Sequence, residues 1–76
     1  MSKSLHYRDD DAIKAFGKRV RELREKKGLT IEEFANSSEI HVTQVSRIER
    51  GESNVSLSYI TLLASKLNVQ VKDLFP

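Results

Sequence analysis

Three pairs of apolar residues divide the second half of the chain into short helical segments. The pairs, with members five positions apart, are Ile40 with Val45, Val55 with Ile60, and Val69 with Leu74. An apolar residue just before a helix cap packs on the residue five positions later, and this contact fixes where the helix begins. The expected caps are His41, Ser56 and Gln70. The pattern predicts helices over residues 42–50, 57–67 and 71–75.

The first half of the chain predicts two further helices. Apolar residues recur at helical spacing at Ile13, Phe16, Val20 and Leu23. Asp11 is the expected cap of this helix, and Gly28 is its expected stop. In "TIEE", Thr30 and Glu33 have the spacing of a capping box, which opens the second helix. The only proline is the last residue, so the chain is expected to be one all-α domain.

The ends of the later helices and their inward faces follow from the same pattern. Gly51 is expected to stop the helix over 42–50, and Asn68 tolerates the left-handed turn after the helix over 57–67. The expected inward face of the helix over 57–67 consists of Leu57, Ile60, Ala64 and Leu67.

Size and composition limit the classes of protein that remain. A chain of 76 residues is marginal as an independent domain, which makes dimerisation plausible. Residues 1–10 are expected to form a flexible arm and residues 11–76 the folded domain. No apolar run has membrane-spanning length and no secretory signal precedes the domain, so a cytoplasmic location is expected. The absence of cysteine excludes disulfides and zinc–cysteine sites.

Basic residues are concentrated near the first helix although the net charge is only +2. Between positions 14 and 27 they are Lys14, Lys18, Arg19, Arg21, Arg24, Lys26 and Lys27, against two acids, Glu22 and Glu25. Such a stripe is a possible footprint for a polyanion, and the alternative is a solvated helix face.

Five residues between positions 31 and 48 are spaced as in a helix-turn-helix. Counted from Ile31, the small Ala35 is fifth, where two helices cross closely, and Glu39 is ninth, in the tight turn. Val45 and Ile48 are fifteenth and eighteenth, where they anchor the second helix to the core.

With those anchors inward, the helix over 42–50 turns hydrogen-bonding side chains outward. They are Thr43, Gln44, Arg47 and Arg50. Arginine can contact guanine O6 and N7 together, and glutamine can contact adenine N6 and N7 together. This face therefore suits base recognition, although the same side chains would also suit a solvated surface.

The chain resembles the Cro/C1-type (XRE-like) helix-turn-helix family, which includes phage repressors and small bacterial regulators. The similar stretches are "RVRELREKKGLT", "EEFA", "VSRIERG", "NVSL" and "LASKLNV…LF", so the resemblance covers about residues 13–75. It implies a compact five-helix lambda-repressor-like DNA-binding domain that binds double-stranded DNA, usually as a homodimer, with the helix over 42–50 in the major groove.

The resemblance also implies roles for individual residues. The residues on the base-reading helix face are Val42, Thr43, Gln44, Ser46 and Arg47. The residues beside the DNA backbone are Thr30, Ile31 and Arg50. Arg24 and Glu49 match a structural ion pair. Three positions depart from the family pattern, since Glu39 replaces a glycine, His41 a Ser or Thr cap, and Ile31 a frequent glutamine.

Two narrower alternatives remain open. The stretch "ESNVSLSYI" resembles controller proteins of restriction–modification systems. Antitoxins and adaptor regulators use the same fold to bind a protein partner instead. For the homodimer, Tyr59, Leu62 and Phe75 are the expected interface residues, with partial burial of Tyr59 and Leu62 as the alternative.

Other chemistry is not indicated by the sequence. His6 and His41 do not form a metal site, because one lies in the arm and the other at a helix cap. No spaced nucleophile–base motif is present, so enzyme activity is not expected. No cofactor and no small-molecule ligand are expected either.

Overall fold

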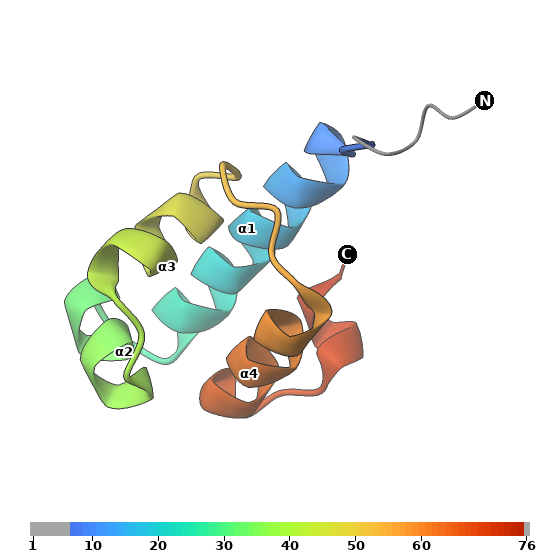
Figure 1. Cartoon of the computed structure of the whole chain (residues 1–76). Coiled ribbons are helices and arrows are strands. Elements are labelled where there is room, and N and C mark those ends of the chain that lie inside the picture. The colour runs from blue at the N-terminus through green and yellow to red at the C-terminus, as the bar shows by residue number, and fades with distance from the viewer. Residues whose placement is uncertain (1–6, 76) are drawn as a thin grey trace.

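The computed structural model describes residues 7–75 and shows an all-α architecture in that range. The elements are α1 (Asp10–Lys26), α2 (Ile31–Ser38), α3 (Val42–Glu49), α4 (Leu57–Leu67) and the 3₁₀ helix η2 (Val71–Leu74). Figure 1 shows α3 on one side of α1 and α4 on the other, with α2 beside the end of α1. The helix-turn-helix formed by α2 and α3 is therefore held against the long first helix.

The start of α1 differs from the sequence-based expectation. Asp9 caps the helix, and its carboxylate accepts a hydrogen bond from the Ala12 backbone N–H at 3.0 Å. Asp11 instead lies in the first turn with Asp10, where a negative charge is favourable beside the helix N-terminus. Asp9 has the extended backbone that a capping residue requires. The helix thus begins one residue inside the arm expected over 1–10, of which residues 1–6 lie outside the described range.

The connection between α2 and α3 is a tight left-handed turn. Thr30 and Glu33 form the expected capping box at the start of α2. The helix ends at Glu39, whose φ is 59° and ψ 37°, and Ile40 then donates a backbone hydrogen bond to Ala35 at 3.0 Å. A residue with a Cβ is strained in this conformation by about 1 kcal/mol, which explains why glycine is common at this position.

The start of α3 lacks the side-chain cap that was expected. His41 has the extended backbone of a capping residue, but its side chain makes no capping hydrogen bond. The expectation that His41 caps the helix is therefore wrong. The chain is turned at this point by burial of Ile40 and Val45, the apolar pair on either side of the cap.

The fifth expected helix is a single 3₁₀ turn. Asp73 donates to the Gln70 carbonyl at 2.9 Å, and Phe75 donates to the Lys72 carbonyl at 3.3 Å. These bonds span three residues, as in a 3₁₀ helix, since a segment of four residues has no room for α-helical bonding. Its Leu74 side chain is nevertheless fully buried.

The core joins α1, α2, α3, α4 and η2. The largest fully buried side chains are Val20, Phe34, Val45, Ile48, Leu63, Leu67 and Leu74. On α4 the inward stripe runs through Leu63, Ala64 and Leu67, whereas Leu57 is 74% exposed. The expectation that Leu57 faces inward is wrong, because this residue lies in the first turn of α4, beyond the edge of that stripe.

Gly17 marks the closest approach of α1 to α3. A Cβ built at this position would overlap the Ile48 carbonyl oxygen and lie 3.1 Å from the Glu49 carbonyl oxygen. Only glycine therefore lets the middle of α1 reach the backbone of α3. A glycine within a helical pattern is the sequence signal for such close packing.

We expect Gly17→Ala to destabilise the protein by about 1–3 kcal/mol, because the added methyl group must push α3 away from α1. Urea denaturation followed by circular dichroism measures this change. Lys18→Ala, at the adjacent exposed position, is the control and should change stability by less than about 0.5 kcal/mol. Stabilisation by Gly17→Ala, as helix propensity alone predicts, would contradict the packing argument.

Candidate nucleic-acid interface

Burial of the helix-turn-helix anchors determines which face of α3 is free. Val45 and Ile48 are buried, and the small Ala35 of α2 is buried beneath the turn. These are the residues that the spacing of the sequence placed inside. The opposite face of α3 carries Val42, Thr43 and Arg47, all exposed to solvent.

Arg47 of α3 is less restrained than Arg50, which follows the helix. Its side chain is exposed, and it forms no ion pair with any residue in the range 7–75. All five of its N–H donors are therefore accessible to a ligand. Thr43, one turn earlier on the same face, adds a hydroxyl and a methyl group.

Gln44 lies at the edge of this face and is half-buried. Its side-chain amide donates to the Ser53 hydroxyl oxygen at 3.3 Å, so the loop after α3 orients it. The other amide hydrogen and the carbonyl oxygen are not used in this bond. Ser53 was not singled out from the sequence, because no local pattern connects residues nine positions apart across a turn.

Arg50 follows the last residue of α3 and is held by two neighbours. Its Nε and one terminal nitrogen donate to the two Glu52 carboxylate oxygens at 3.0 and 3.2 Å. Its other terminal nitrogen donates to the Ser46 hydroxyl at 3.0 Å. Ser46, expected to take part in base reading, therefore contacts Arg50 instead of pointing freely from the helix.

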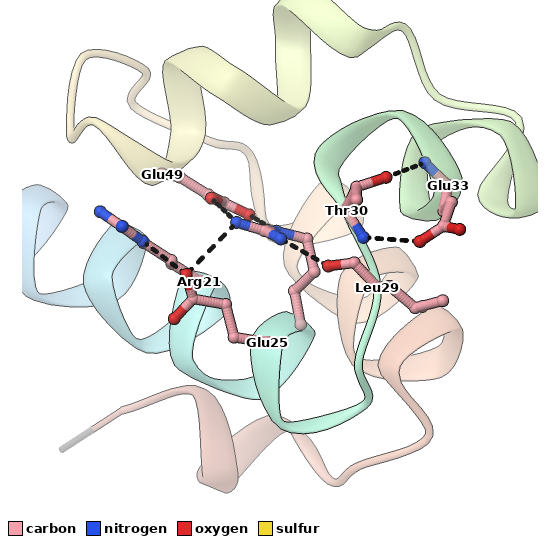
Figure 2. Close-up of polar contacts among 7 residues, drawn as sticks. Arg21, Glu25, Leu29, Thr30, Glu33 and Glu49 are labelled. Atoms are coloured by element: carbon pink, nitrogen blue, oxygen red, sulfur yellow. Dashed lines mark hydrogen bonds and ion pairs between the residues drawn. The ribbon is translucent and has the colours of Figure 1, made fainter.

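The structure brings Arg24 and Glu49 together as expected. The Arg24 guanidinium donates to both carboxylate oxygens of Glu49, at 2.6 and 2.9 Å, and its remaining terminal nitrogen donates to the Leu29 carbonyl at 2.6 Å. In Figure 2, Glu49 extends from α3 toward α1. The Leu29 carbonyl approaches from the other side, where the chain enters α2. The contacts tie α1, the chain entering α2, and the end of α3 to one another.

Burial makes this ion pair different from the others on the surface. The Arg24 and Glu49 side chains are 8% and 5% exposed, whereas those of the nearby Arg21–Glu25 pair are 62% and 53% exposed. The hydrogen bond to Glu49 is the main cause that raises the pKa of Arg24, against the opposing effect of desolvation. Arg24 therefore remains charged at every pH at which the protein would be studied.

A polar cleft of about 300 Å³ lies where α1, α2 and α3 meet. It is lined by Arg21, Arg24, Ile31, Ser46, Glu49 and Arg50. The cleft thus brings together two of the expected backbone-contacting residues, Ile31 and Arg50, although they are far apart in sequence. Thr30 is exposed next to Ile31, with its hydroxyl oxygen accepting from the Glu33 backbone N–H at 3.0 Å.

The basic residues near α1 do not form one continuous stripe. Arg21 and Arg24 turn toward α3 and line the cleft. Arg19 turns the other way, forming an ion pair with Glu22 at 3.3 Å and donating to the Asp73 carbonyl of η2 at 2.7 Å. Only part of the basic stretch is therefore near the candidate interface.

Two other kinds of site are not found in the described part of the chain. Among residues 7–75, no three His, Cys, Asp or Glu side chains are grouped as metal ligands would be. No helix in this range is long and apolar enough to cross a membrane.

A helix-turn-helix family model matches residues 20–74, which is more than two thirds of the chain. The chain belongs to the helix-turn-helix family. The matched residues include all of α2, α3, α4 and η2 and the second part of α1.

Proteins similar to this helix-turn-helix chain include regulators of two kinds. Control protein C.BamHI of Bacillus amyloliquefaciens is 43% identical over 60 residues, which cover 78% of this chain and 74% of that protein. The HTH-type transcriptional regulator DdrOP3 of Deinococcus deserti is 41% identical over 56 residues, or 74% of this chain. The chain spans only 43% of the length of DdrOP3.

A solved structure supports the same fold. The restriction–modification controller protein C.AhdI from Aeromonas hydrophila is 42% identical, with a TM-score of 0.78. The match covers 88% of this chain and 100% of the C.AhdI chain. The helix-turn-helix and its surrounding helices therefore have a common arrangement in the two proteins.

The three residues expected at a dimer interface differ in exposure. Leu62 and Phe75 are 36% and 49% exposed. Tyr59 is partly buried against the core, as the alternative interpretation of this residue proposed. The Phe75 ring packs against Phe16 of α1 with 5.5 Å between centroids, so part of the ring is covered within the same chain.

We expect loss of either Arg24 or Glu49 to destabilise the fold by about 3–5 kcal/mol, since the remaining charge would be buried without its partner. The double variant Arg24→Met/Glu49→Leu should be destabilised by far less than the sum of the single variants Arg24→Met and Glu49→Leu. Chemical denaturation of all three, compared with wild type, gives this coupling free energy.

Glu22→Gln, which breaks the more exposed pair with Arg19, is the control for the buried pair. Its effect should remain below about 1 kcal/mol, because solvent screens exposed ion pairs. Additive effects of the two single variants at Arg24 and Glu49 would show that the pair does not act as a unit.

Proposed function

We propose that the protein is a sequence-specific DNA-binding transcriptional regulator that places α3 in the major groove. The observation that carries this proposal is the free outer face of α3, with Thr43 and Arg47 exposed while Val45 and Ile48 are buried opposite. Membership of the helix-turn-helix family and the similarity to named regulators support the same function.

Base recognition is assigned to the outer face of α3. Arg47 can donate two parallel hydrogen bonds to guanine O6 and N7, because its guanidinium is not engaged within the described chain. Val42 and Thr43 offer methyl groups to thymine, and Thr43 also offers a hydroxyl. Gln44, with one amide hydrogen on Ser53, keeps a donor and an acceptor for an adenine.

Contacts to the DNA backbone are assigned to the rim of the cleft. Ile31 and Glu32 occupy the first two positions of α2, where backbone N–H groups have no partner within the helix. Such groups bind phosphate readily. The Thr30 hydroxyl accepts a bond in the capping box but retains its own hydrogen to donate. Arg50 lines the same cleft as this helix end and offers its remaining N–H donors to a phosphate.

Regulation would follow from occupancy of an operator by a dimer. A bound dimer can block polymerase at a promoter or recruit it from a flanking site. Two reading helices related by a twofold axis would lie roughly 34 Å apart, one turn of DNA. The similarity to C.BamHI and C.AhdI makes control of a restriction–modification system the more specific candidate for the regulated genes.

We expect wild-type protein to enrich a palindromic site from a random-oligonucleotide pool. Arg47→Ala should weaken binding to that site by about 1–3 kcal/mol and relax the preference at one symmetric base pair, because the lost side chain reads a base edge. Fluorescence anisotropy with the selected site and its single-base variants measures both effects.

Lys18→Ala provides a control that removes the same charge from an exposed position of α1. It should leave base preference unchanged. Affinity of the wild-type protein should fall steeply with salt, as phosphate contacts require. Absence of any enriched sequence, together with salt-insensitive capture of a protein partner, would instead favour an adaptor or antitoxin.

We expect Leu62→Lys to shift the protein from dimer to monomer at micromolar concentrations, because a charge would replace an exposed apolar side chain in the proposed interface. Sedimentation velocity measures this shift. Leu57→Lys, on the same helix but outside the proposed interface, is the control and should remain dimeric. If only Leu57→Lys becomes monomeric, the interface lies on the other flank of α4.

A further inference from the structure

We infer that Glu52 is a positioning residue of the interface, which holds Arg50 in one direction and thereby lowers the protein's affinity for DNA of unrelated sequence. This inference rests on the proposed DNA-binding function. It concerns the side chain of Glu52 in the loop after α3.

The Glu52 side chain is placed so that it occupies Arg50 without supporting the fold. Both of its carboxylate oxygens accept hydrogen bonds from Arg50, and the two side chains are 57% and 54% exposed. The turn itself is held by the backbone, since the Glu52 N–H donates to the Arg47 carbonyl at 3.0 Å and Gly51 donates to Ile48 at 3.0 Å. Arg8 also donates to the Glu52 carbonyl oxygen at 3.1 Å. Removing the carboxylate charge therefore leaves the path of the chain intact.

The contacts to Glu52 and Ser46 use three of the donors of Arg50. A guanidinium has five N–H groups, so only two remain for a phosphate. Because the planar group is held on three sides, these two point in one fixed direction. Arg47, three residues earlier, has no such restraint in the described chain.

The ion pair also removes most of the local charge that attracts a polyanion. Arg50 and Glu52 together carry no net charge, so a phosphate approaching from a distance is attracted less than it would be by a free arginine. A phosphate contact is independent of base sequence. An unrestrained Arg50 would therefore strengthen binding to every sequence, including those on which α3 does not fit the groove.

The restraint acts unequally on matched and unmatched DNA. On a site that α3 fits, the DNA backbone approaches in one fixed position, and an arginine already held in place loses little freedom on binding. On other sequences the backbone approaches in varied positions, which a held arginine cannot follow. Glu52 should consequently reduce affinity for unmatched DNA more than affinity for the selected site.

The test compares Glu52→Gln with wild type on the selected site and on random-sequence DNA. We expect affinity for random-sequence DNA to rise about fivefold and the slope of log affinity against log salt to become steeper by about one unit, as one freed charge predicts. Affinity for the selected site should change by less than about twofold, so the ratio of the two affinities falls.

Glu22→Gln is the matched control, because it removes one negative charge from an exposed ion pair beside η2 and away from α3. It should behave as wild type in every measurement. A second set of variants in the Arg50→Ala background then shows whether Glu52 acts by holding Arg50 or through repulsion of DNA by its own negative charge. In that background Glu52→Gln should have no effect on affinity for random-sequence DNA, because the residue it acts through is absent.

Three results would overturn the inference. They are equal effects of Glu52→Gln and Glu22→Gln, an equal gain on both kinds of DNA, and a gain that persists when Arg50 is absent. Unchanged thermal unfolding of Glu52→Gln ensures that any difference arises at the interface. If the wild-type protein binds no DNA in the same assay, the proposed function fails, which is a separate outcome from these three.

Discussion

The buried ion pair between Arg24 and Glu49 fixes the position of α3, and the candidate interface depends on that position. One guanidinium bonds to the carboxylate at the end of α3 and to the Leu29 carbonyl just before α2. A displacement of any of the three segments would leave a buried charge or carbonyl without its partner, at a cost of several kcal/mol. Apolar packing alone is less directional, because it tolerates sliding of one helix on another.

Close packing reinforces this directional contact. Gly17 lets the backbone of α1 touch that of α3, and Ala35 is small enough to lie beneath the turn between α2 and α3. The left-handed backbone of Glu39 is maintained even though a glycine would be less strained there. The surrounding contacts therefore outweigh the preference of Glu39 for a negative φ, and they hold α3 at one angle.

The interface divides its polar side chains into free and restrained groups. Arg47 is free of ion pairs within residues 7–75, whereas Gln44 is held by Ser53 and Arg50 by Glu52. Both restraining residues lie in the loop after α3, so this loop sets the direction of two side chains of the candidate interface. Side chains held in one direction suit a surface that presents its partners in that direction, because they adapt poorly to a surface with another arrangement.

The all-α class, the helix-turn-helix spacing and the buried anchors Val45 and Ile48 could all be predicted from local sequence patterns, because helical periodicity and capping are local properties. Local patterns also predicted a capping box at Thr30 and a left-handed end at Asn68. They misplaced the cap of α1, the exposure of Leu57 and the nature of the last helix. The folded structure alone shows which basic residues line the cleft, and that Ser53 and Glu52 hold two side chains of the candidate interface. Such contacts depend on how separate segments meet in space, and the choice among neighbouring polar partners leaves no periodic trace in the sequence.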